Sequence, residues 1–128
     1  MRRSILALVI LGVVALPAAA TAHGTCSAVA KTPVRSPDQV SFTGGFQCGT
    51  TIHDSMGANV YAQRRTPGQA WVTLDVRAIN CFGADTCTTV LVTAGQNCAK
   101  DYRTHVAAGF ANPGGHTGSK NAVSAHTC

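Results

Sequence analysis

The sequence predicts an all-β fold, a sandwich of about seven short antiparallel strands. Runs rich in Val, Thr and aromatic residues are separated by Gly, Pro, Asn and Asp, which is the pattern of strands joined by turns. No window keeps a helical apolar period over about ten residues. Because the turns recur at spacings typical of a β-sandwich, we expect a single all-β domain.

The chain opens with the pattern of a cleavable secretory signal peptide over residues 1–22, which leaves a domain of residues 23–128. Arg2 and Arg3 precede an unbroken apolar run from Ile5 to Leu16, and small residues follow. This run is shorter than the ~20 residues that cross a bilayer. We therefore expect a secreted, extracellular protein with no stable membrane insertion after cleavage.

Two bonds fit signal peptidase, and the choice between them decides which residue heads the mature chain. Cleavage after Ala22, which we prefer, leaves His23 at the terminus, whereas cleavage after Ala20 does not. Either cut removes two arginines and lowers the net charge from +5 to +3. No basic cluster larger than Arg64-Arg65 remains, so nucleic acid is not an expected partner.

All six cysteines lie after the cleavage site. An even number of cysteines in an exported chain predicts disulfides, here three. No C-x-x-C pair is present, which argues against a zinc site. Sequential pairing would join neighbouring strands with each bridge, and it gives Cys26–Cys48, Cys81–Cys87 and Cys98–Cys128.

The first strands are expected near Ser27 to Lys31 and around Val40 and Phe42, which alternate with polar residues. Gly44-Gly45 is expected to break or bulge the second of these before it continues at Phe46-Gln47-Cys48.

A β-hairpin gives the clearest local signal. One strand runs from Asn59 to Arg65, a turn follows at Thr66-Pro67-Gly68-Gln69, and the return strand runs from Ala70 to Ile79. Along the return strand a period of two predicts an apolar, core-facing side and a wet side. The apolar side would carry Val72, Leu74, Val76 and Ala78, and the wet side Thr73, Asp75 and Arg77.

The remaining strands are expected over Thr88–Thr93, Tyr102–Phe110 and Ala122–Cys128. A turn at Phe82-Gly83-Ala84-Asp85 lies inside the Cys81…Cys87 pair, and Asn112-Pro113-Gly114-Gly115-His116 forms a loop.

Several of these residues carry a resemblance. Gln63-Arg64-Arg65, the Pro-Gly turn, Trp71-Val72-Thr73, Cys98, Tyr102-Arg103-Thr104 and the closing Ser124-to-Cys128 segment resemble small secreted disulfide-bonded β-sandwich proteins of actinobacteria, over roughly Val60 to Cys128. The resemblance implies an immunoglobulin-like fold and brings no catalytic residue. The Cys81…Cys87 loop is also similar to one in the enediyne-binding apoproteins of those bacteria.

The hairpin tip is the predicted binding surface. Arg64 and Arg65 place guanidinium groups on a rigid hairpin, which suits carboxylate or phosphate partners. Tyr61 would face outward beside them if its neighbours Val60 and Ala62 face the core. Trp71, which follows the turn, is the fourth candidate binding residue. Trp71, Tyr61, Phe82 and Phe110 could form an exposed aromatic platform for sugars, but core packing is the favoured role of these aromatic residues.

Copper binding is the alternative from a different class. A terminal His23 chelates copper through its amine and its imidazole, and a second histidine completes the site. His105 and His126 are the favoured partners because both lie on predicted strands, while His53 and His116 remain open. This arrangement resembles the histidine brace of copper monooxygenases and periplasmic copper carriers, although the Asp-x-His of the carriers is missing.

Enzymatic activity is not expected. His53-Asp54-Ser55 holds the residue types of a hydrolase triad, but side chains adjacent in sequence rarely converge, so it is interpreted as a turn. Glutamate is absent, which removes a common acid–base residue. The sequence thus favours a secreted, non-catalytic protein without a cofactor that binds a cell-envelope polymer or an extracellular protein.

Overall fold

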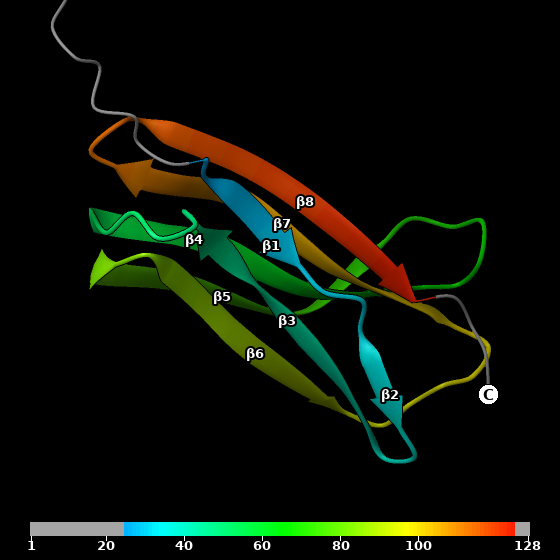
Figure 1. The fold of residues 1–128 in the computed structure, drawn as a ribbon. Coiled ribbons are helices and arrows are strands. Elements are labelled where there is room, and N and C mark those ends of the chain that lie inside the picture. Colours follow the sequence, from blue (N-terminus) through cyan, green and yellow to red (C-terminus); the bar gives the residue numbers. More distant parts are fainter. Residues whose placement is uncertain (1–24, 125–128) are drawn as a thin grey trace, which may run out of the picture.

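In a computed structural model that describes residues 25–124, the chain forms two antiparallel sheets packed face to face (Figure 1). This part of the chain contains eight strands and no helix, so none that is long and apolar enough to cross a membrane. The strands are β1 (Ser27–Ala30), β2 (Val34–Ser36), β3 (Gln39–Gln47), β4 (His53–Arg65), β5 (Val72–Ala84), β6 (Thr86–Ala94), β7 (Asp101–Asn112) and β8 (His116–Ser124).

The strand order is that of an immunoglobulin-like sandwich. In the first sheet β6 pairs with β3 along its whole length, while β1 and β2 share the opposite edge of β3. The second sheet has the order β5-β4-β7-β8. At the two sides of the sandwich β5 lies beside β6 and β1 beside β8 (Figure 1). The predicted all-β, immunoglobulin-like sandwich is therefore confirmed.

The core lies between the sheets and follows the strand period of two. Alternate residues of β3 from Val40 to Phe46 and of β4 from Met56 to Ala62 are buried there. The largest fully buried apolar side chains come from β3, β4, β6 and β7, and they are Tyr102, Phe42, Phe46, Met56, Leu91, Val40, Val60 and Val106.

The prediction that Gly44-Gly45 breaks or bulges its strand is wrong, because β3 pairs continuously through both glycines with β1 and β6. A Cβ atom at Gly44 would lie 2.7 Å from a methyl group of Val106 and 3.0 Å from one of Val60. Gly44 therefore serves close packing of the two sheets, whereas a Cβ atom at Gly45 would clash with the carbonyl oxygen of Cys87 on the neighbouring strand β6.

Two of the predicted disulfides are present among the described residues. Cys26–Cys48 joins the chain just before β1 to the chain just after β3, and Cys81–Cys87 joins β5 of one sheet to β6 of the other. The third predicted bridge involves Cys128, which lies outside residues 25–124. No free cysteine occurs within that range.

Three segments differ from the sequence-based expectation. Val34–Ser36 forms an additional short strand. The last strand begins at His116 and not at Ala122, so it is longer than predicted within the described range. His53-Asp54-Ser55 is not a turn but the start of β4, and the His53 side chain is buried there.

Candidate functional site

The outer face of the β5-β4-β7-β8 sheet carries most of the predicted binding residues. On β4, Val60 and Ala62 are fully buried against the other sheet. Tyr61 lies between them in the strand and therefore faces outward, as expected. Its ring packs against the ring of His105 on β7, with the centroids 5.3 Å apart, so Tyr61 and His105 form the middle of this outer face.

The predicted apolar face of β5 is reversed over most of its length. Leu74 packs against the core, but it is the extra residue of a β-bulge: Asp75 pairs with Ala62, and Thr73 pairs with Gln63. Because one added residue shifts the following side chains to the opposite side of a strand, Val76 and Ala78 face outward. Val72, at the start of β5, is 59% exposed.

The predicted wet residue Arg77 is exposed, as expected, but it lies on the side of β5 that faces the other sheet. Its register partner is the buried residue Val60. From there its guanidinium donates hydrogen bonds to the hydroxyl of Thr89 at 2.8 Å and to the carbonyl of Val90 at 3.3 Å, both on β6. At this edge of the sandwich a polar side chain thus links β5 to β6, and the apolar residues Val76 and Ala78 lie on the outer face of the sheet.

The exposed aromatic and apolar residues extend this face toward both ends of the sheet. Val76, the register partner of Tyr61, is 50% exposed, and Phe82 is 75% exposed. Val123 of β8, paired with Arg103, is 48% exposed. The prediction that Phe82, Trp71, Tyr61 and Phe110 pack in the core is therefore wrong, since none of them belongs to it.

Trp71 contacts two guanidinium groups at the hairpin end of the face. The central carbon of Arg65 lies 4.4 Å from the centroid of the Trp71 ring, and that of Arg103 lies 4.6 Å from it. Arg65 also donates to a carboxylate oxygen of Asp101 at 3.1 Å. Arg103 donates to the side-chain oxygen of Gln63 at 2.6 Å. We call Arg65, Arg103, Trp71, Gln63 and Asp101 the tryptophan cluster.

The positive charge of the tryptophan cluster is only partly compensated. Burial lowers the pKa of Arg103, and the nearby charge of Arg65 lowers it further. Within residues 25–124, the ion pair found in the cluster is Arg65–Asp101, whereas Arg103 contacts the amide of Gln63 and the ring of Trp71. An anionic group on a ligand would supply a negative counter-charge for the guanidinium of Arg103.

Arg64 does not join Arg65 at this site. It pairs with Tyr102 on β7, whose side chain is buried, while Arg65 pairs with Asp101. Consecutive residues of a strand point to opposite faces. The two arginines that the sequence places together are therefore separated by the sheet, and the second guanidinium of the site comes from Arg103.

A cavity of about 380 Å³ opens further along the face. Irregularities in the pairing create it: the β4–β7 register shifts between Gly57 and Asn59, and Ala108 on β7 adopts a φ of 50°. The small side chains of the alanines leave the cavity unfilled, and the amide groups of Asn59 and Asn80 and the ring of Phe110 border it. The lining residues are Ala58, Asn59, Ala78, Ile79, Asn80, Ala108 and Phe110.

Of the three residues named for the copper alternative, only His105 lies within residues 25–124. His105 lies on β7, where its Nδ1 atom is hydrogen-bonded to the side-chain oxygen of Asn121. His23 and His126 lie outside residues 25–124. A different set of potential ligands occurs at the opposite end of the sheet, where Cys26, Cys48 and His53 bring two sulfur atoms and an imidazole nitrogen within 4.8 Å of one another.

Comparisons of the chain with family models, with curated proteins and with solved structures find no match. The resemblance to secreted actinobacterial sandwich proteins therefore stays a prediction.

Sequence reasoning missed Arg103, Gln63, Asn59 and Asn80 as site residues. Arg103 and His105 alternate with buried residues on a strand that was predicted correctly, and this alternation indicates that they share one face. Their proximity to Trp71 depends on the pairing of β4 with β7, which no local pattern specifies.

Proposed function

We propose that the chain is a secreted, non-catalytic binding protein whose outer β5-β4-β7-β8 face binds an anionic polysaccharide of the cell envelope. The observation that carries the proposal is the reversed face of β5, which places Val76 and Ala78 in solvent beside Tyr61 and Phe82 in solvent further along the strand. Exposed apolar residues that continue into an aromatic and basic cluster are typical of an interaction site.

The side chains of the face suit sugars. Aromatic rings at Phe110, Tyr61 and Trp71 offer flat apolar surfaces for the C–H faces of a pyranose. The amides of Asn59 and Asn80 at the cavity supply donors and acceptors for hydroxyl groups. A cavity of about 380 Å³ falls in the size range of small-ligand sites and would accept one sugar unit of a longer chain.

The charge of the face favours an acidic polymer over a neutral one. Arg103 and Arg65 meet at Trp71, with Asp101 as the carboxylate beside them. Guanidinium groups bind carboxylates and phosphates through paired hydrogen bonds. The signal-peptide pattern and the two disulfides support export to the compartment where such polymers occur.

Trp71 provides the test, because it is the single tryptophan of the chain. Its fluorescence should change in a saturable way on titration with polygalacturonate, a carboxylated polysaccharide, and much less with neutral dextran. Arg103→Gln should weaken the binding of polygalacturonate by roughly tenfold or more, which corresponds to about 1.4 kcal/mol or more. Arg64→Gln is the matched control, since it removes an equal charge on the opposite side of the same sheet.

Equal binding of both polymers, or equal losses in the two variants, would refute an anionic-polysaccharide site on this face. A pull-down would refute it as well if the protein bound envelope proteins but bound neither isolated envelope polysaccharide nor polygalacturonate.

A further inference from the structure

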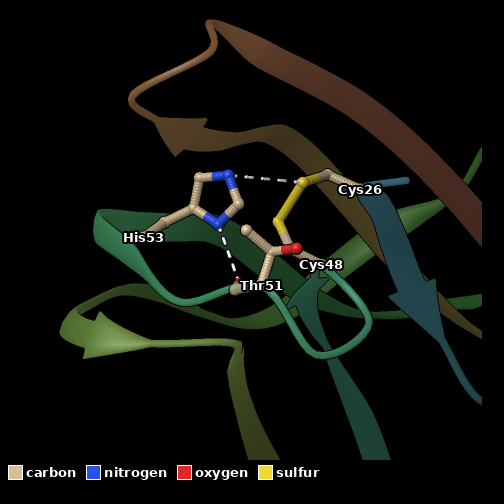
Figure 2. The surroundings of a disulfide bond; sticks show 4 residues. All are labelled: Cys26, Cys48, Thr51 and His53. Atoms are coloured by element: carbon tan, nitrogen blue, oxygen red, sulfur yellow. Dashed lines mark hydrogen bonds between the residues drawn. A yellow bond between two sulfur atoms is a disulfide. The ribbon is translucent and has the colours of Figure 1, made fainter. Parts of the chain in front are cut away.

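A second chemical site lies at the opposite end of the sheet from the tryptophan cluster and is independent of the proposed function. Cys26 precedes β1, Cys48 follows β3, and His53 begins β4 (Figure 2). Cys48 and His53 are buried, whereas Cys26 is partly exposed. The imidazole Nε2 atom of His53 lies 3.8 Å from the sulfur of Cys26.

The orientation of the His53 ring is fixed by the backbone. Its Nδ1 atom lies 3.0 Å from the carbonyl oxygen of Thr51. A carbonyl oxygen only accepts hydrogen bonds, so Nδ1 carries the donated proton. In the neutral imidazole this leaves the lone pair on Nε2, which points at the sulfur of Cys26 (Figure 2). Histidines that bind metals are commonly held in this way, with the second ring nitrogen donating to a carbonyl or carboxylate group.

We propose that, when the Cys26–Cys48 disulfide is reduced, the two thiolates and Nε2 of His53 form a binding site for Zn²⁺. Zinc bonds of about 2.3 Å to sulfur and about 2.0–2.1 Å to nitrogen place neighbouring ligands of a tetrahedron about 3.5–3.8 Å apart. The three ligand atoms already lie within 4.8 Å of one another. Small side-chain movements are therefore sufficient to complete the set.

The ligands stay together without the covalent bond because the strands hold them. Ser27 pairs with Gln47 in the β1–β3 ladder, which keeps the adjacent residues Cys26 and Cys48 close. The amide of Cys48 donates to the carbonyl of Asp85 at 2.9 Å. Reduction removes the sulfur–sulfur bond but leaves these backbone hydrogen bonds in place.

The sulfur atoms of Cys26 and Cys48 either form the disulfide or, once reduced, bind Zn²⁺. A dithiol reductant supplies two electrons and two protons, so the disulfide becomes two thiols and the reductant becomes a disulfide. Zn²⁺ then replaces both thiol protons, which pass to solvent, while Nε2 of His53 donates its lone pair. Water fills the fourth position of the tetrahedron. Among residues 25–124, the imidazole of His116 lies beside that of His53, with the ring centroids 5.5 Å apart.

The test uses the full secreted chain, reduced with dithiothreitol and freed of it under inert gas. Co²⁺ serves as the spectroscopic probe for the zinc site. We expect one Co²⁺ per chain with a sulfur-to-cobalt charge-transfer absorption, displaced by Zn²⁺. The double variant Cys81→Ser/Cys87→Ser should retain this signal, because it removes the other described cysteine pair. His53→Gln should lower the affinity by roughly tenfold or more.

Mass spectrometry of alkylated thiols provides a readout that does not depend on a variant folding. In the reduced wild-type chain, Zn²⁺ should slow alkylation of the partly exposed Cys26 and leave that of the partly exposed Cys81 unchanged. Loss of the cobalt signal in Cys81→Ser/Cys87→Ser, an unchanged affinity in His53→Gln, or equal slowing of Cys26 and Cys81 by Zn²⁺ would overturn the proposal.

Discussion

The guanidinium of Arg103 lies 4.6 Å from the centroid of the Trp71 ring, and that of Arg65 lies 4.4 Å from the same centroid. One aromatic ring thus fixes two cations that come from different strands. A cation over an aromatic ring contributes about 0.5–1 kcal/mol at an exposed site. Trp71→Ala should therefore lower the free energy of unfolding by about 1–2 kcal/mol in urea titrations, and Trp71→Phe by less. Equal effects of the two substitutions would show that these contacts do not stabilise the fold.

The cavity beside Asn59 and Asn80 should be sensitive to filling. Ala78→Leu places a larger side chain at its border on an exposed strand, so the stability should change little. Binding of polygalacturonate should weaken by about tenfold, or about 1.4 kcal/mol, as measured by Trp71 fluorescence. Ala94→Leu makes the same change on an exposed residue of the other sheet and should leave binding intact. Unchanged affinity in Ala78→Leu would exclude the cavity from the polymer site.

Two glycines that pair across β7 and β8 should differ in their tolerance of a methyl group. A Cβ atom at Gly109 would lie 2.6 Å from the ring of Phe46 and 2.8 Å from the carbonyl oxygen of Gly118. At Gly118 the nearest atom would be 3.5 Å away, which is ordinary contact. Overpacking a core typically costs about 1–3 kcal/mol, so Gly109→Ala should lower the free energy of unfolding by that amount. Gly118→Ala is the control, and thermal melts that rank the pair in reverse would contradict this account.

The two disulfides within residues 25–124 should contribute unequally to stability because they close loops of different length. The sequence separation is 22 residues for Cys26–Cys48 and 6 for Cys81–Cys87. On the chain-entropy model the longer loop is worth about 3.5 kcal/mol and the shorter about 2 kcal/mol. Urea unfolding of Cys26→Ala/Cys48→Ala and of Cys81→Ala/Cys87→Ala measures both losses. A larger loss from the Cys81–Cys87 pair would mean that its link between the two sheets matters more than loop length.

Local patterns in the sequence predict the fold class, the hairpin and two disulfides, because turn residues and strand periodicity are local signals. They predict the buried side of β4 around Tyr61 but not that of β5. The bulge at Leu74 depends on the pairing of β5 with β4, and it reverses the side on which Val76 and Arg77 lie. After the bulge, side chains of β5 still alternate between the two sides of the sheet, but Arg77 and not Val76 lies on the side toward the core.

The candidate site is less predictable than the fold for a related reason. Trp71 and Arg65 were recognised because they flank one turn, which is a short-range relationship. Arg103 is distant in the sequence and reaches them through the β4–β7 ladder. Arg64 was assigned to the site because it is adjacent in sequence, although adjacency in a strand separates side chains.

The polar residues that close the β5 edge also bear on self-association. The order β5-β4-β7-β8 leaves β5 at the border of its sheet, and a long border strand is a template on which another chain can add. Asp75 and Arg77 occupy the middle of this strand, and Leu74 bulges beside them. Charged side chains and a bulge both oppose the addition of a further strand. The irregularity that turns Val76 and Ala78 toward solvent thus also opposes the association of further chains along that border.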